Sequence, residues 1–242
     1  VAKMVSPVMK MLKPIISPEV KEAIKVASDD DIITLTNNIK LDDTLKINKV
    51  ININLNNYTI EASKKVFLVE NGHLKLSGKG YIKETKPEYG AIMIIGSQNE
   101  VDTNYSSVTV DQGVILEGWS GIFITHNSSK SYGVLVDFAG NINAKSDKDG
   151  GEGVGIYVNG NIQDKTNAPV VNILDGAKIT STGNGLYIAG YATFNINNAY
   201  ISGVESGIGI KSGILNIDGA EVYGTGPDET PTEGYNNGIK AS

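Results

Sequence analysis

Two aspartates stand where a sugar-cleaving site could form. Asp111 follows the segment Val108-Thr109-Val110, and Asp137 follows Val134-Leu135-Val136, so both come directly after an apolar-x-apolar segment. On adjacent strands the two carboxylates would lie about 5 Å apart, the separation associated with retaining glycosidases. Aspartate at a strand end also commonly forms a turn by bonding to its own backbone. The later repeats carry at this position Leu174, Asn197 and Asp218. We therefore expect a structural corner column rather than a catalytic pair.

Few other side chains could do chemistry. The chain has no Cys and no Arg, and its histidines are His73, in NGHLKL, and His126, in THNSS, which lie far apart in the sequence. These residues indicate no nucleophile–histidine pair and no thiolate metal site, and we predict no catalytic residue. The loop DKDGGEG offers carboxylates at Asp147, Asp149 and Glu152 that suit Ca²⁺, but it lacks the full EF-hand pattern. We interpret it as an exposed acidic loop and predict no metal site and no cofactor.

A short phrase that reads Gly, apolar, variable, apolar or small recurs along the chain. Its five copies are SGIFITH from Ser120, VGIYVNG from Val154, NGLYIAG from Asn184, SGIGIKS from Ser206 and NGIKAS from Asn237. A second pattern, apolar-x-apolar, starts at Val108, Val134, Val171, Phe194 and Leu215, with spacings of 26, 37, 23 and 21 residues. Each unit therefore contains about three short strand segments separated by Gly- and Asn-rich corners.

Strand-only repeats with such spacings are typical of a solenoid or a propeller. The shortest units, 21 and 23 residues, suit one circuit of three short strands better than a four-stranded blade. A single coil buries too little apolar surface to be stable alone, whereas stacked coils share a continuous core. We predict a parallel β-helix over residues 32–242. Because GIKAS ends without a polar closing coil, we expect the β-helix to continue beyond residue 242.

The N-terminal part is predicted to differ from the repeats. Residues 17–31 read as a capping helix and a corner, with Ser17 as the N-cap and Pro18 at the first helical position. One apolar face of this helix comprises Val20, Ala23, Ile24 and Ala27. Residues 1–16 are either a poorly ordered terminus or an arm that attaches the chain to a partner. The apolar residues of that arm are Val5, Val8, Met9, Met11, Leu12, Ile15 and Ile16.

The repeated phrase predicts an outward aromatic column. Successive side chains of a strand point to opposite faces, so the variable residue points outward when its apolar neighbours face the core. Equivalent positions of stacked coils lie about 4.8 Å apart, which aligns Phe123, Tyr157 and Tyr187, with Met93 one coil earlier. The column could stabilise its own sheet, contact another subunit or stack against sugars. We adopt the subunit contact as the functional hypothesis.

A second outward column is predicted for Asn172, Asn195 and Asn216, the middle residues of three successive apolar-x-apolar segments. Stacked side-chain amides can hydrogen-bond along a solenoid. We expect this column to be structural.

At these repeats, over residues 28–242, the chain resembles right-handed, single-stranded parallel β-helix proteins of the pectate-lyase-like kind. The resemblance implies an all-β fold with right-handed coils. The repeats are also similar to the β-helical fibres and spikes of bacteriophages, which are commonly homotrimers with an N-terminal attachment segment. Enzymes of this fold act on acidic polysaccharides, and their sites combine acidic residues with an Arg or Lys base, or with a His and an Arg. This chain has no Arg and no GHG-like phrase.

Composition narrows the functional classes further. The net charge is −6 and every basic residue is Lys, so the basic face needed to bind nucleic acid is missing. No apolar run reaches the roughly 20 residues that span a bilayer, and we expect no membrane insertion. We predict a non-enzymatic structural subunit of a surface fibre or spike, on a phage virion or alternatively on a cell surface. Its partners would be identical subunits, with a trimer favoured, and a capsid, tail or cell-surface protein. The alternatives are a polysaccharide lyase or glycosidase and a polysaccharide-binding adhesin.

Overall fold

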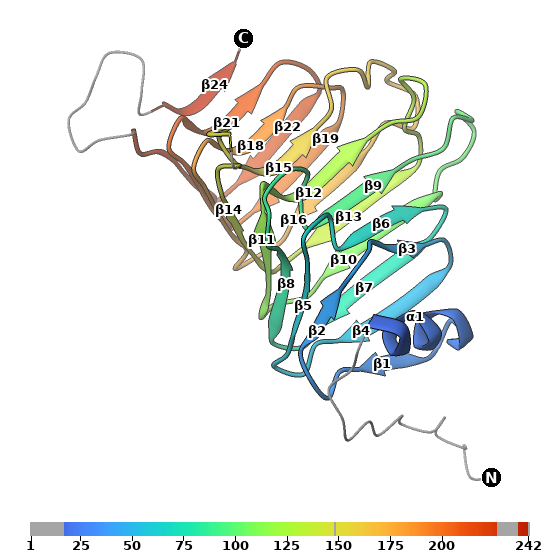
Figure 1. Ribbon diagram of the computed structural model, residues 1–242. Helices are drawn as coiled ribbons and strands as arrows, with labels where there is room; N and C mark the ends of the chain where they lie inside the picture. The colour runs from blue at the N-terminus through green and yellow to red at the C-terminus, as the bar shows by residue number, and fades with distance from the viewer. Residues whose placement is uncertain (1–16, 148, 227–236, 242) are drawn as a thin grey trace.

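The computed structural model describes residues 17–147, 149–226 and 237–241. The apolar residues of the predicted attachment arm, Val5, Val8, Met9, Met11, Leu12, Ile15 and Ile16, lie outside this part of the chain. Within it, the chain winds through three parallel sheets of eight strands each (Figure 1). Three successive strands, one from each sheet, make one coil.

Each coil adds one strand to each sheet, and every pairing between named strands is parallel. The first sheet comprises β1 (Ile32–Thr34), β4 (Val50–Asn54), β7 (His73–Ser77), β10 (Ser106–Val110), β13 (Val134–Phe138), β16 (Val170–Ile173), β19 (Thr193–Asn197) and β22 (Ile214–Asp218). The second sheet comprises β2 (Ile39–Leu41), β5 (Thr59–Ala62), β8 (Gly80–Glu84), β11 (Val114–Gly118), β14 (Asn141–Ala144), β17 (Lys178–Ser181), β20 (Tyr200–Gly203) and β23 (Glu221–Gly224). The third sheet comprises β3 (Leu45–Ile47), β6 (Phe67–Glu70), β9 (Ile92–Ile95), β12 (Ser120–Thr125), β15 (Val154–Val158), β18 (Asn184–Ile188), β21 (Ser206–Ile210) and β24 (Asn237–Ala241). The predicted parallel β-helix is therefore confirmed.

The core consists of apolar columns that run along the axis of the solenoid. In the second sheet one such column is fully buried and comprises Ile39, Ile60, Ile82, Leu116, Ile142, Ile179 and Ile201. Burial in this solenoid depends on the neighbouring coils. Ile196 and Ile217 occupy paired positions on β19 and β22, yet they are 2% and 39% exposed. Stacking, rather than the local sequence, completes the core.

The glycine of the repeated phrase is required by close packing between the second and third sheets. A Cβ atom on Gly155 would lie 2.2 Å from the carbonyl oxygen of Gly185 and 2.3 Å from Cγ2 of Ile179. A Cβ on Gly185 would in turn lie 2.5 Å from the carbonyl oxygen of Gly207. At these positions in the later coils a side chain larger than hydrogen would clash with the neighbouring coil, so glycine is required. The glycine of the repeated phrase thus marks this corner in the sequence.

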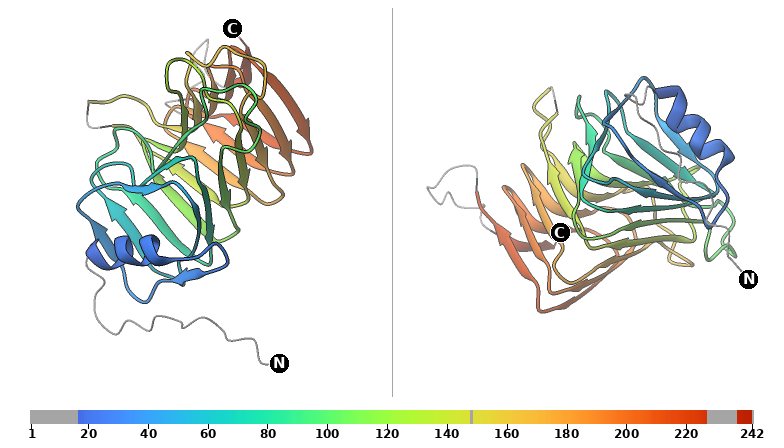
Figure 2. Two further views of the ribbon diagram at one scale, coloured as in Figure 1. Left: turned by 90° about the vertical axis from the view of Figure 1, so that its right-hand side faces the viewer. Right: turned by 90° about the horizontal axis from the view of Figure 1, so that it is seen from below.

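The helix α1 (Ser17–Val26) lies across the first coils at the N-terminal end of the solenoid (Figure 2). Val20 and Ile24 are buried against the core. The Lys49 ammonium donates hydrogen bonds to the carbonyl oxygens of Lys25 and Ala27 at the C-terminal end of the helix, where a positive charge is favourable. The helix thereby covers apolar side chains at the N-terminal end of the described core. Among the described residues, no helix combines the length and the apolar character that a bilayer span requires.

Candidate functional site: an aromatic column on the third sheet

The third sheet aligns the variable residues of the repeated phrase in one outward column. Met93 on β9 pairs with Phe123 on β12, Phe123 pairs with Tyr157 on β15, and Tyr157 pairs with Tyr187 on β18. The column extends one coil further toward the N-terminus to Leu68 on β6. All five side chains are half-buried. The apolar stripe thus crosses five strands and runs parallel to the solenoid axis.

The three aromatic rings of the column stack on one another. The ring centroids of Phe123 and Tyr157 are 4.9 Å apart with an interplanar angle of 26°, and those of Tyr157 and Tyr187 are 5.7 Å apart with an angle of 8°. Near-parallel rings at these distances overlap face to face with an offset. Both faces of Tyr157 are therefore covered by its neighbours. Sugar rings bind to aromatic faces, so this arrangement disfavours the column as a sugar-stacking platform.

Trp119 joins the column from the side and was not predicted as part of it. It is the single residue between β11 and β12, and its ring lies edge-on at 6.3 Å from Phe123 and 5.7 Å from Tyr157. Its backbone N–H donates to the buried carboxylate of Glu84 over 3.1 Å. The only sequence signal is its place directly before the phrase SGIFITH.

Glu84 fixes the corner beside the column. Its carboxylate also accepts the backbone N–H groups of Glu88, Tyr89 and Gly90, over 3.2, 3.1 and 2.9 Å. Burial raises the pKa of Glu84, whereas the four N–H groups act in the opposite direction. The side chain thus ties the loop between β8 and β9 to the turn that carries Trp119.

The aromatic column ends at Gly209 on β21, which pairs with Tyr187. A Cβ atom on Gly209 would lie 3.0 Å from Cδ2 of Tyr187, so the tyrosine ring leans over this glycine. The Lys211 ammonium lies 5.4 Å from the centroid of the same ring, within cation–π range. A hydrogen bond with Tyr187 raises the pKa of Lys211. The C-terminal end of the stack is therefore cationic.

Two carboxyl groups meet at the corner between the second and third sheets. Glu152, from the loop between β14 and β15, forms a hydrogen bond with Glu205, and this contact raises the pKa of Glu152 to about 7. Asn184 donates to the Glu205 carboxylate over 2.6 Å. Sequence reasoning missed this pair because the two residues belong to coils that are not adjacent, the fifth and the seventh.

The acidic loop does not gather its carboxylates. Asp147 accepts the backbone N–H groups of Asp149 and Gly151, over 2.8 and 2.7 Å, and so stabilises its own turn. Glu152 instead contacts Glu205. No group of three or more His, Cys, Asp or Glu side chains that could hold a metal ion occurs within the described ranges.

The predicted equivalence of Asp111 and Asp137 is wrong. Asp137 pairs with Thr109, and Ala139 takes the position that Asp111 occupies one coil earlier, since the N–H of Asp111 donates to Leu76 and that of Ala139 to Val110. The Asp111 carboxylate lies 3.5 Å from the Lys75 ammonium on one neighbouring coil. The Asp137 carboxylate accepts a hydrogen bond from Asn172, 2.8 Å away on the other neighbouring coil. The register therefore does not bring the two together as a catalytic pair.

Asp137 instead ends the asparagine column on the first sheet. Each asparagine donates its Nδ2 to the preceding coil: Asn216 to Asn195 over 2.8 Å, Asn195 to Asn172 over 2.9 Å, and Asn172 to Asp137. The predicted amide ladder is present, and an acceptor-only carboxylate closes it at one end.

The two histidines bond at separate places: His73 on β7 contacts the neighbouring strand β10, and His126 lies in the turn that follows β12. Nδ1 of His73 lies 2.9 Å from the hydroxyl oxygen of Ser107, and Nδ1 of His126 accepts the backbone N–H of Ser129. Neither lies in a contact with the aspartates described above. Their bonds are those of strand and turn residues.

Comparison of the chain with protein-family models, with curated proteins and with solved structures gives no match.

Proposed function

We propose that this chain is a non-enzymatic structural subunit of a surface fibre or spike, and that the aromatic column of the third sheet contacts an identical subunit. The observation that carries the proposal is the unbroken apolar stripe from Leu68 to Tyr187, half-buried along five coils. Five coils correspond to four inter-strand steps, or about 19 Å. Contiguous apolar stripes of this kind mark interaction surfaces.

The direction of the stripe favours association of rods side by side. It runs parallel to the solenoid axis, so two or three copies placed with parallel axes can bury it along its whole length. The stacked rings present their edges outward, because their faces are covered by one another. A partner would therefore meet a ridge of ring edges flanked by Trp119. We favour a trimer with this ridge toward the shared axis.

A structural role also agrees with the contacts of the candidate catalytic side chains. Asp137 accepts from the asparagine ladder, Asp111 is ion-paired with Lys75, and His73 bonds to Ser107. Each is engaged by neighbouring strands rather than directed at a shared point. These contacts are the reason for preferring a scaffold to a lyase or a glycosidase.

The same proposal includes the handedness of the coils and the place where the fibre is carried. We take the coils to be right-handed and pectate-lyase-like, since crossover connections between parallel strands are right-handed in nearly all proteins. A rigid β-helical rod of this kind suits a phage head or tail fibre, attached through its N-terminal arm. A fibre on a cell surface is the alternative location.

The test replaces Phe123, Tyr157 and Tyr187 together by serine and measures the molar mass by light scattering after size-exclusion chromatography. We expect the wild-type chain to have the mass of an oligomer, and the triple variant the mass of one chain. Circular dichroism verifies that the variant keeps its strands.

The matched control removes an aromatic pair from a different sheet. The ring centroids of Tyr200 and Tyr223 on the second sheet are 5.6 Å apart. The variant with both tyrosines replaced by serine should remain oligomeric. Met93→Glu adds a charge to the stripe without breaking the ring stack and should also yield single chains. A wild-type chain with the mass of a monomer, or a triple variant with unchanged mass, would reject the proposed contact.

A further inference from the structure

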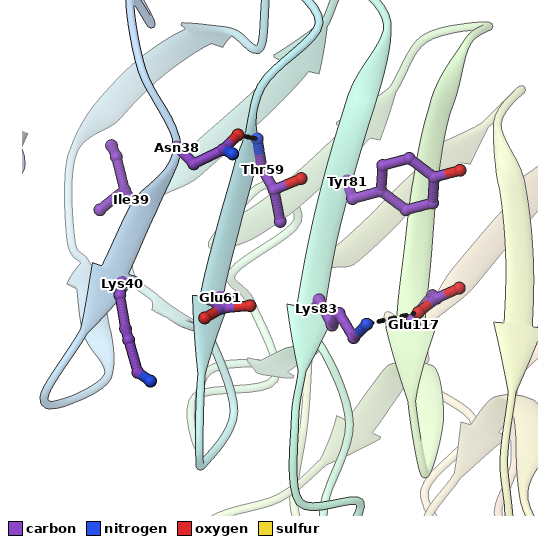
Figure 3. A pocket seen from close by; sticks show the side chains of 8 residues that line it. All are labelled: Asn38, Ile39, Lys40, Thr59, Glu61, Tyr81, Lys83 and Glu117. Atoms are coloured by element: carbon purple, nitrogen blue, oxygen red, sulfur yellow. Dashed lines mark hydrogen bonds and ion pairs between the residues drawn. The ribbon is translucent and has the colours of Figure 1, made fainter. Parts of the chain in front are cut away.

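The outer face of the second sheet carries a groove that the proposed function does not use. It has a volume of about 520 Å³, within the roughly 300–1,000 Å³ range of ligand pockets (Figure 3). It crosses four successive strands, β2, β5, β8 and β11, and therefore spans about 14 Å. Its lining residues are Asn38, Ile39, Lys40, Thr59, Glu61, Tyr81, Lys83 and Glu117.

The charges of the groove alternate along the solenoid axis. Lys40 pairs in register with Glu61, Glu61 with Lys83, and Lys83 with Glu117. Glu117 is engaged on both sides, since the ammonium groups of Lys83 and Lys145 lie 3.6 and 3.2 Å from its carboxylate. The two lysines and two glutamates of the lining balance one another in charge.

Two of these charged groups, those of Lys40 and Glu61, form no ion pair within the described residues, since neither has a partner within 4.0 Å. Glu61 is half-buried, and within the described residues no protein group donates to its carboxylate. Hydrogen bonds to such an ionised acceptor are stronger than those between neutral groups. The groove therefore offers a free cationic donor beside a free anionic acceptor.

Tyr81 offers the ring face that the aromatic column lacks. Its neighbours in the sheet are Thr59 and Ile115, and its ring contacts no other aromatic ring of the described residues. The residue is 40% exposed. Tyr157, by contrast, is covered on both faces. Figure 3 shows the Tyr81 ring extended over the sheet, in line with Thr59 and above the row of charged side chains.

We propose that this groove binds a short segment of an uncharged glycan. One pyranose ring stacks its C–H face on Tyr81, and the hydroxyl groups donate to Glu61 and accept from Lys40. Asn38 adds to the rim: its Oδ1 accepts the Thr59 N–H over 2.9 Å, which leaves Nδ2 as a donor. Ring stacking with paired donors and acceptors on a charge-balanced surface matches a neutral polyol chain.

Other ligand classes fit this surface less well. An acidic polysaccharide would meet Glu61 and Glu117 as well as the lysines, so its charge gains nothing net. A peptide could add a strand only at a sheet edge, whereas this groove lies on the face of a sheet whose backbone groups are already paired. The uncharged glycan is therefore the occupant that the lining favours.

The experiment titrates the whole chain, by isothermal titration calorimetry, with uncharged hexasaccharides: cellohexaose, laminarihexaose, maltohexaose, xylohexaose and mannohexaose. Hexagalacturonic acid and a chitosan hexamer serve as charged comparators. We expect at least one uncharged probe to bind and both charged probes to bind more weakly. Tyr81→Ala should weaken binding roughly three- to tenfold, from the loss of one stacking contact. Glu61→Gln, which keeps the shape of the side chain, should weaken binding roughly tenfold.

Matched variants separate this site from the aromatic column. Tyr223→Ala removes a tyrosine that is 46% exposed on the same sheet but outside the groove, and it should leave binding unchanged. The triple serine variant of Phe123, Tyr157 and Tyr187 should also bind as the wild type does. The proposal is overturned if none of the five uncharged probes binds, if only a charged probe binds, or if Tyr81→Ala retains full affinity.

Discussion

Tyr157 is the centre of the aromatic column, and its replacement by leucine gives a graded test of the stack. The ring contacts Phe123, Tyr187 and Trp119, with centroid distances of 4.9, 5.7 and 5.7 Å. Each aromatic pair contributes about 0.5–1.5 kcal/mol beyond the area it buries. Leucine keeps apolar bulk at the position but removes all three contacts. We therefore expect Tyr157→Leu to lower the free energy of unfolding by about 1.5–4.5 kcal/mol.

The geometry also predicts which pairs of residues are energetically coupled. Tyr157 and Tyr187 touch, so a double-mutant cycle between them should give a coupling of about 1 kcal/mol. Phe123 and Tyr187 are separated by the Tyr157 ring and by two inter-strand steps, about 9.6 Å. The two residues interact only through the shared Tyr157 ring, so their coupling should be smaller than that between Tyr157 and Tyr187.

These stabilities can be measured by the fluorescence of Trp119. It is the only tryptophan of the chain, and it contacts the rings of Phe123 and Tyr157. Its fluorescence during urea unfolding therefore reports on the coils that carry the stack. Dilute protein keeps association out of the measurement.

The pattern of couplings decides the outcome. A coupling between Phe123 and Tyr187 as large as that between Tyr157 and Tyr187 would contradict the stacked order. A Tyr157→Leu variant with wild-type stability would show that the ring contacts contribute nothing, and the reasoning about the column would fail.

Three further perturbations test the surrounding structure. Gly155→Ala should lower the free energy of unfolding by about 1–3 kcal/mol, measured by thermal unfolding, because its Cβ would meet the backbone of the next coil at 2.2 Å. Gly160→Ala, whose Cβ would lie 3.5 Å from the nearest atom, should be tolerated. Equal effects of the two substitutions would refute the packing argument. The contact with Glu205 raises the pKa of Glu152 from 4.5 to about 7, so the protonated carboxyl group is favoured in the folded state. The resulting contribution to stability is fully present below pH 4.5 and is lost as the pH rises through about 7. Glu152→Gln should therefore flatten the dependence of the melting temperature on pH between 5 and 8, and an unchanged slope would contradict the carboxyl contact. Glu84→Ala leaves four backbone N–H groups without their acceptor and should cost at least about 2 kcal/mol, measured by urea unfolding; Glu84→Gln, which keeps one acceptor oxygen, should cost less.

The outward column was predictable because strand periodicity determines the face of every side chain. The glycine of each phrase marks the same corner, so residues counted from it fall into register, as Phe123, Tyr157 and Tyr187 do. The asparagine ladder follows instead from the apolar-x-apolar segments, whose middle residues are Asn172, Asn195 and Asn216. Each of these strands contains one copy of its repeated pattern, so it can be aligned with the neighbouring strands in only one way.

The same rule failed where a strand offers two alignments. In VLVDF both Val134-Leu135-Val136 and Val136-Asp137-Phe138 read apolar-x-apolar, and a shift by two residues keeps every side chain on its face. The hydrogen-bonded register pairs Phe138 with Val110 and thereby selects the second alignment. That shift separates Asp111 from Asp137.

The sequence by itself determined the faces of the strands, the corners and the stacking of coils, because these follow from local alternation and from the repeated glycine. Only the tertiary structure decided which residues meet across corners and across coils. Trp119 joins the aromatic rings because β11 and β12 are linked by one residue, and Glu152 meets Glu205 because its loop reaches two coils away. The groove on the second sheet likewise gathers side chains from four coils. Such encounters depend on loop geometry and on the register between coils, which a local pattern does not encode.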